Sequence, residues 1–252
     1  MINSGFTTDL DVSFARADEG SSGYTTYGAA ALIGTVAHAA DALSFAPAEY
    51  YLVSGKKTKL IGWYPRRSGV SYTQGTRVVD FGEIDGKTDL MATVLYEGSK
   101  GTKISSITFN HLLTQFSIKV YAPDAAAQGL WGTVSSIKIA EKKQTCTITL
   151  PAATETANTA AAPTFTGNSD LDLVNTDLTT SPASTINYPL TLGVGTAANA
   201  AQAGYAMFAP QTAGNVVLKI ELSSGVTQTV NVPVPTTPTP QVFFMDTRMK
   251  SL

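Results

Sequence analysis

The sequence predicts an all-β protein made of two tandem β-sandwich domains. Three observations favour this fold class: apolar and polar residues alternate at period two, charged residues are scarce, and turn-forming residues recur between the alternating segments. Charged residues make up 14% of the 252 residues and apolar residues make up 43%, whereas an average globular protein has about a quarter of its residues charged. Such a chain can bury a core, and its Thr- and Ser-rich strands suit an extracellular β-protein.

Alternating segments predict the strands of the first domain. In the first segment, Leu10, Val12 and Phe14 alternate with Asp11 and Ser13. Further strands are expected at 50–53, 59–65, 77–84 and 90–96, followed by a hairpin of strands 131–139 and 146–150 that turns at 141–143.

The longest alternating segment, 107–120, changes phase along its length. Its apolar residues occupy odd positions up to Leu113 and even positions from Phe116. Because one inserted residue reverses the facing of a strand, we expect a β-bulge or a short break near 113–115.

A shift in composition predicts the domain boundary. Residues 151–162 are rich in Ala and Thr and show no periodicity, so the predicted domains are 1–150 and 151–252. The second domain is expected to contain strands at 186–194, 205–209, 216–222 and 226–234, with a helical turn or a loop at 197–203.

Charge and cysteine content exclude several classes of protein. The net charge is −2 and no basic cluster exceeds two consecutive residues, which argues against nucleic-acid binding. No apolar segment approaches the length of a membrane-spanning helix. The single cysteine, Cys146, excludes a disulfide framework and is interpreted as a small buried strand residue.

The sequence contains no convincing catalytic, cofactor-binding or metal-binding motif. Asp85 and Gly86 favour a turn, and the segment that follows lacks the spacing of a phosphate loop. His111 alternates in phase with Phe109 and Leu113, so we interpret it as a hydrogen-bonded structural residue. We therefore predict a protein that is not an enzyme and that binds no cofactor or metal.

An ordered set of short blocks resembles the fimbrillin-like family, the pilus subunits of Bacteroides-type bacteria. The similarity is best over 45–150, and the blocks that carry it are Ile61-Gly62-Trp63-Tyr64-Pro65, Val79-Asp80-Phe81, Asp89-Leu90-Met91, Phe109-Asn110-His111-Leu112-Leu113 and Phe116-Ser117-Ile118-Lys119-Val120. No single block is specific, and the resemblance rests on their order and spacing.

The resemblance implies two β-sandwich domains of transthyretin-like or immunoglobulin-like Greek-key type. It also implies an exported outer-membrane lipoprotein that acts as a structural fimbrial subunit, or as a tip or anchor component. The implied partners are other fimbrial subunits, joined by donor-strand exchange after a protease removes the first strand. No signal peptide opens the sequence, so the export signal and the lipid-bearing cysteine are expected to lie outside this chain.

Carried onto this sequence, the resemblance predicts removal of a strand at 10–15. The candidate cleavage site is the bond between Arg16 and Ala17, in front of the polar segment 18–23, which we expect to be a flexible loop. The alternative interpretation is that Arg16 is an ordinary surface residue.

The C-terminal segment departs from the family pattern. The codons of residues 245–251, read in a shifted frame, can encode Gly-His-x-Tyr-Glu-Ile, which resembles the block that opens the last strand pair of a fimbrillin. Our hypothesis is that a frameshift in the gene or in its sequencing truncated these strands, and resequencing the locus tests it.

Two other functions remain open at the level of the sequence. A surface adhesin or glycan-binding module on the same fold would be favoured by an exposed group of aromatic residues in a groove. A glycosidase would require two close carboxylates in a pocket, and nothing singles out two among Glu83, Asp85 and Asp89.

Overall fold

The described chain forms two compact units that are interleaved in sequence. The computed structural model describes residues 7–211 and 214–234, together with the backbone of 243–245. Unit 1 comprises residues 1–83, 89–113 and 145–166, and unit 2 comprises residues 84–88, 114–144 and 167–252. Pro151, where the sequence predicts a domain boundary, lies inside unit 1. The frameshift hypothesis concerns residues that lie almost entirely outside the described part of the chain.

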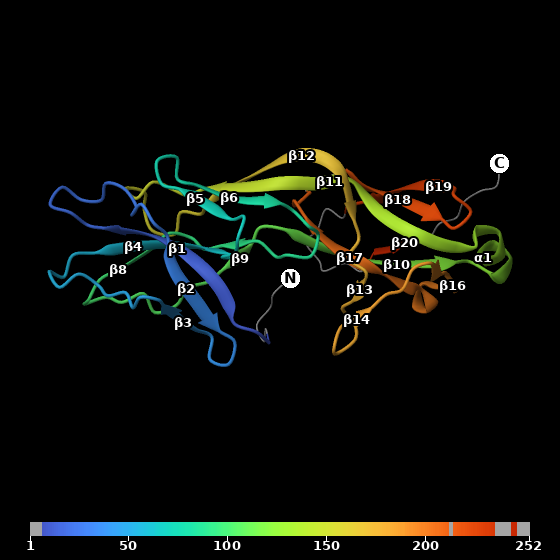
Figure 1. Ribbon diagram of the computed structural model, residues 1–252, viewed down its shortest axis with the longest axis horizontal. Helices are drawn as coiled ribbons and strands as arrows, with labels where there is room; N and C mark the ends of the chain where they lie inside the picture. Colours follow the sequence, from blue (N-terminus) through green and yellow to red (C-terminus); the bar gives the residue numbers. More distant parts are fainter. Residues whose placement is uncertain (1–6, 212–213, 235–242, 246–252) are drawn as a thin grey trace. The chain divides into compact units, whose positions relative to one another are not determined.

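Unit 1 is built around an antiparallel sheet with β1 near its centre (Figure 1). The sheet order is β3-β2-β1-β4-β7-β9, and β8 also pairs with β4. These strands are β1 (Leu10–Asp18), β2 (Leu32–Ala37), β3 (Ala42–Phe45), β4 (Thr58–Tyr64), β7 (Met91–Ala92), β8 (Tyr96–Gly98) and β9 (Asn110–His111). The alternating segment at the N-terminus is thus confirmed as a strand that is paired on both sides.

Both faces of β1 are buried, and they differ in the size of their side chains. Leu10, Val12 and Phe14 lie on one face, which we call the Phe14 face, and pack in one apolar cluster with Met91. The buried residues of the opposite face are Ser13, Ala15 and Ala17. Period-two alternation explains how one strand presents large residues to one layer and small residues to the other.

Two further strands of unit 1, β5 (Ser71–Thr73) and β6 (Val78–Glu83), pair with each other. On its other side, β6 pairs with residues 145–149 of the long strand β11 (Thr133–Thr149). Cys146 and Ile148 of β11, and Val79 and Phe81 of β6, are almost completely inaccessible to solvent.

Burial makes Cys146 chemically inert in the folded protein. Removal from solvent raises the pKa of its thiol to about 12, so almost no thiolate is present near neutral pH. We expect no reaction of the native protein with Ellman's reagent at pH 8 within an hour, and one thiol per chain after unfolding in guanidinium chloride. Rapid labelling of the native protein would contradict the buried position.

Unit 2 has two groups of paired strands around an apolar core. In one, β10 (Thr114–Ala122) pairs with β17 (Ala201–Phe208), and also with the short parallel strands β16 (Gly193–Val194) and β20 (Phe243–Met245). In the other, the N-terminal part of β11 pairs with β18 (Asn215–Leu222), which pairs with β19 (Thr227–Pro233). The rings of Phe116 and Phe208 stack in this core with centroids 4.8 Å apart.

Six further elements complete the described structure. They are β12 (Ala162–Asp172), β13 (Thr176–Asp177), β14 (Ser184–Thr185), β15 (Leu190–Thr191), the 3-10 helix η1 (Ala197–Asn199) and the helix α1 (Ala125–Trp131). The side chain of Asp124 caps α1 by accepting a hydrogen bond from the backbone N–H of Ala127 at 2.7 Å. Within the described part of the chain, no helix has the length and apolar character needed to cross a bilayer.

The prediction of a hairpin turning at 141–143 is wrong. Residues 133–149 form one continuous strand, whose two parts pair with β18 and with β6. Glu141 adopts a positive φ of 58° inside it, but the segment lacks the glycine that a tight hairpin turn favours. The expected break near 113–115 is found at 112–113, between β9 and β10.

The strand predicted at 50–53 is also wrong. These residues form a loop in which the side chains of Tyr50 and Val53 are 78% and 91% exposed. Likewise, the segment 90–96 is not one continuous strand, since only β7 and the first residue of β8 fall within it. Segment 90–96 still runs along β4, because β7 and β8 both pair with that strand, and its pairing is interrupted at 93–95.

Candidate functional site: strand β1 and the lysine network

Strand β1 lies between β2 and β4, and its residues are held from both sides. Leu10 to Phe14 pair with residues of β2, and Ser13 to Asp18 pair with residues of β4. Removal of this strand would therefore leave unpaired N–H and C=O groups on two neighbours and an exposed apolar surface on the Phe14 face.

Arg16 lies inside this strand, which ends at Asp18. Its position pairs with Leu60, and its carbonyl oxygen accepts a hydrogen bond from the N–H of Gly28 at 2.8 Å. The guanidinium group contacts the Glu49 carboxylate at 2.6 Å and donates to the carbonyl oxygen of Tyr50 at 2.9 Å. The Arg16 side chain is only 16% exposed, so the bond to Ala17 is protected in the folded protein.

The segment after Arg16, expected to be flexible, is tied down at several points. The hydroxyl of Thr58 donates to the carboxylate of Asp18 at 2.7 Å. The backbone N–H of Glu19 donates to the carbonyl oxygen of Lys57, and the backbone N–H of Lys57 donates to the Glu19 carboxylate, both at 2.9 Å. Tyr27 is 2% exposed and its hydroxyl donates to the carbonyl oxygen of Pro151 at 2.9 Å. These contacts fix residues 18 and 19 to the start of β4 and Tyr27 to the segment after β11, whereas residues 20–23 form a largely exposed turn. The flexibility of the polar segment stays a prediction.

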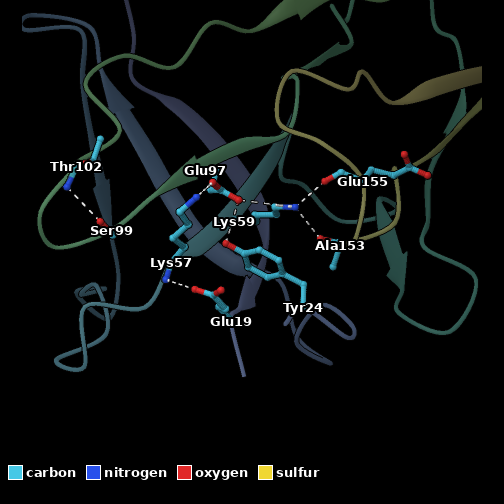
Figure 2. A network of polar contacts seen from close by, with 9 residues as sticks. All are labelled: Glu19, Tyr24, Lys57, Lys59, Glu97, Ser99, Thr102, Ala153 and Glu155. Atoms are coloured by element: carbon cyan, nitrogen blue, oxygen red, sulfur yellow. Dashed lines mark hydrogen bonds and ion pairs between the residues drawn. The ribbon is translucent and has the colours of Figure 1, made fainter. Parts of the chain in front are cut away.

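A buried lysine organises the next group of contacts, which we call the lysine network (Figure 2). Its members are Glu19, Tyr24, Lys57, Lys59 and Glu97, together with the carbonyl oxygens of Ala153 and Glu155. The Lys59 amine donates to the carbonyl oxygen of Ala153 at 3.0 Å and to that of Glu155 at 2.5 Å. The Lys59 side chain is 5% exposed, and its amine lies 4.2 Å from the centre of the Tyr24 ring.

Glu97 links the exposed and buried parts of the lysine network. Its carboxylate contacts the amine of Lys57 at 2.6 Å and that of Lys59 at 3.9 Å, and it accepts a hydrogen bond from the Tyr24 hydroxyl at 3.2 Å. The hydrogen bond from Lys57 lowers the pKa of Glu97, and desolvation raises the pKa of Tyr24. The pKa of Glu97 is therefore lower in the folded than in the unfolded protein. Its ionised carboxylate stabilises the fold at a pH above its pKa in the unfolded protein, and this stabilisation is lost as the pH falls through its pKa in the folded protein.

One feature of the sequence indicates the buried position of Lys59, although it was not used to predict the lysine network. Lys59 is in phase with Ile61 and Trp63 along β4, and both of those side chains are buried. A lysine on the buried face of a strand needs acceptors for its ammonium group, and the carbonyl groups at 153 and 155 supply them.

The two histidines lie apart from this network. His111 Nδ1 is 2.8 Å from the carboxylate of the buried Asp89, and the role of His111 as a structural residue stays a prediction. His38 is half-exposed and pairs with Asp9 at 2.7 Å. Among the described residues, no group of three or more His, Cys, Asp or Glu side chains is arranged to hold a metal ion.

A hollow lies on the Phe14 face, between the sheet of unit 1 and the segment 104–109. It has a volume of about 390 Å³, and its aromatic and polar lining residues are Asp41, Phe45, Tyr51, Ser105, Ser106 and Phe109. A second hollow of about 110 Å³ shares Phe45, Tyr51 and Leu60 with it and extends to Arg16, Glu49 and the exposed Tyr50. The two hollows together form an aromatic-lined groove next to β1.

Comparisons with known proteins indicate the family and the fold of this chain. A family model described as fimbrillin-like matches residues 4–242. The crystal structure of a proposed cell adhesion protein from Bacteroides uniformis ATCC 8492 is similar in fold, with a TM-score of 0.55 and 16% sequence identity. The similarity covers 90% of this chain and 80% of that one. No curated protein matches the sequence.

Proposed function

This chain belongs to the fimbrillin-like family, and we propose that it is a structural subunit of a cell-surface fimbria that joins its neighbours by strand exchange. The observation that carries this proposal is the position of β1. It is the first strand of the described residues, it is paired on both sides, and Arg16 near its end offers a cleavage site. A strand from a second subunit could satisfy the same backbone groups and cover the same apolar face after β1 is removed.

The contacts around Arg16 suggest how cleavage is limited. An arginine-specific protease must bind the guanidinium group and an extended segment of backbone, so Arg16 has to leave Glu49 and β1 has to open locally. The lysine network and Tyr27 would hold the chain on the C-terminal side of the cut. Only the residues up to Arg16 would then be released.

We expect the Glu49→Ala substitution to raise the rate of cleavage after Arg16 about threefold to tenfold. Loss of a partly buried charge-assisted hydrogen bond removes about 1 kcal/mol from the cost of freeing Arg16. The cut is measured by mass spectrometry in an Arg66→Lys/Arg67→Lys background, which removes two cleavage sites in the loop after β4. An equal rate in both proteins would show that Arg16 release does not limit cleavage.

The assembly proposal is tested with the same cleaved protein. Electron microscopy and size-exclusion chromatography should show filaments if the protein is a shaft subunit, or a complex of one chain with one donated strand if it is a tip or anchor. Absence of any cut after Arg16 in both the parent and the Glu49→Ala protein would contradict processing at this site.

The aromatic-lined groove favours a second candidate function, a glycan-binding adhesin. The larger hollow has the volume of a small-ligand site and combines aromatic rings with Asp41, Ser105 and Ser106, and no Lys or Arg lines it. Neutral sugars bind through ring stacking combined with hydrogen bonds to hydroxyl groups. Saturation-transfer NMR with galactose, mannose and N-acetylglucosamine tests this function: the signal should fall in Asp41→Asn and persist in the exposed control Asp172→Asn. Absence of a signal with all three sugars would reject it.

A further inference from the structure

Two glycines flank β1 and allow its large side chains to lie against the neighbouring backbones. Gly62 of β4 pairs with Phe14, and Gly34 of β2 pairs with Val12. A Cβ atom added at Gly62 would lie 2.4 Å from Cε1 of the Phe14 ring, and one added at Gly34 would lie 3.0 Å from a methyl carbon of Val12. A Cβ atom does not approach a non-bonded carbon atom more closely than 3.0 Å in well-packed proteins, so the Phe14 ring requires glycine at position 62.

Two aromatic side chains pack against the Phe14 ring. Phe14 is completely buried, and its ring packs edge-on against Phe45 and Phe109, with centroid distances of 5.4 Å and 5.9 Å. Edge-to-face packing of this kind favours an aromatic occupant over an aliphatic one. We call the space bounded by Gly62, Phe45 and Phe109 the aromatic notch.

The opposite face of β1 has room only for small side chains. Ser13 and Ala15 pair with Trp63 and Ile61 of β4 and are 6% and 0% exposed. Because this layer is fully packed, a larger side chain at either position would have to displace its neighbours.

We propose that the aromatic notch selects the strand that replaces β1. This inference rests on the proposed strand exchange and adds the chemistry of the partner. The incoming strand comes from a second fimbrillin-like subunit. It carries an aromatic residue at the position of Phe14, aliphatic residues at those of Leu10 and Val12, and Ser, Ala or Gly at those of Ser13 and Ala15.

This requirement excludes strands that merely alternate in hydrophobicity. In this chain's own sequence, the segment Val-Phe-Phe-Met at 242–245 has a bulky residue at every position, so this sequence does not meet the requirement. The sequence 10–15 meets it and therefore provides the parent probe.

The experiment measures exchange of fluorescent peptides into the full chain after cleavage at Arg16. The probes are the peptide 9–16, its Phe14→Ala and Phe14→Tyr variants, and the control Asp11→Ala, which changes an exposed position. We expect the Phe14→Ala peptide to bind at least about 100-fold more weakly than the parent. The Phe14→Tyr and Asp11→Ala peptides should bind within about tenfold of it.

A matched change in the acceptor gives the second measurement. The Gly62→Ala protein, made with Phe14→Ala in its own β1 so that it folds before cleavage, should reject the parent peptide and accept the Phe14→Ala peptide at least as well as the unmodified protein does, because the added methyl group occupies part of the notch. If both peptides bind the unmodified protein equally, the notch does not select and only this inference is wrong. If neither peptide binds, strand exchange at β1 is itself wrong, and the inference fails with it.

Discussion

Replacing Phe14 with alanine is expected to lower the free energy of unfolding of unit 1 by about 3–5 kcal/mol. The ring is completely buried and packs against Phe45 and Phe109, so its loss removes apolar burial and leaves a cavity beside Gly62. Chemical denaturation followed by Trp63 fluorescence in a Trp131→Phe background reports on unit 1, since Trp63 belongs to unit 1 and Trp131 to unit 2.

The exposed Tyr50 provides the control for this measurement. Its side chain lies in the loop after β3 and is 78% exposed, so Tyr50→Ala should change the free energy of unfolding by less than about 0.5 kcal/mol. A similar cost for both substitutions would mean that the Phe14 face is not packed as described.

Replacing Lys59 with methionine is expected to lower the free energy of unfolding of unit 1 by about 2–4 kcal/mol. Methionine retains most of the side-chain volume, so the cost comes from the lost donor. The carbonyl oxygens of Ala153 and Glu155 would lose their hydrogen bonds, and Tyr24 would lose the cation over its ring. The same fluorescence measurement applies.

Lys57 is the matched control for Lys59. It lies two residues earlier, is 57% exposed and also contacts Glu97, but water and salt screen exposed ion pairs, which therefore contribute little to stability. The result that would contradict the structural role of the buried lysine is an equal cost for Lys57→Met and Lys59→Met.

Local alternation was sufficient to predict many of the strands. The segments at β1, β6, β10, β18 and β19 each carry a period-two pattern, and the phase change before Phe116 coincides with the break between β9 and β10. The continuity of β11 could not be predicted in this way. Its charged middle resembles a turn, and pairing with strands distant in the sequence keeps it extended.

The candidate site could be predicted only in part, because most of its contacts join residues that are far apart in the sequence. Arg16 stands out as the arginine that ends the first alternating segment. Its partner Glu49 is 33 residues away, and the carbonyl oxygens that hold Lys59 are more than 90 residues away. Contacts at such separations depend on the tertiary fold, which a periodic pattern does not specify.

The interleaving of the two units determines how the chain can be divided into expression fragments. A fragment of residues 1–150 would lack Pro151, Ala153 and Glu155, and therefore the backbone acceptors of Tyr27 and Lys59. Extending the fragment to residue 166 would complete unit 1, but it would also include β10 without β17 and the N-terminal part of β11 without β18. Strands without partners promote aggregation. Neither unit is therefore a self-contained gene segment, and ribosomal synthesis must pass residue 200 before β10 can find its antiparallel partner.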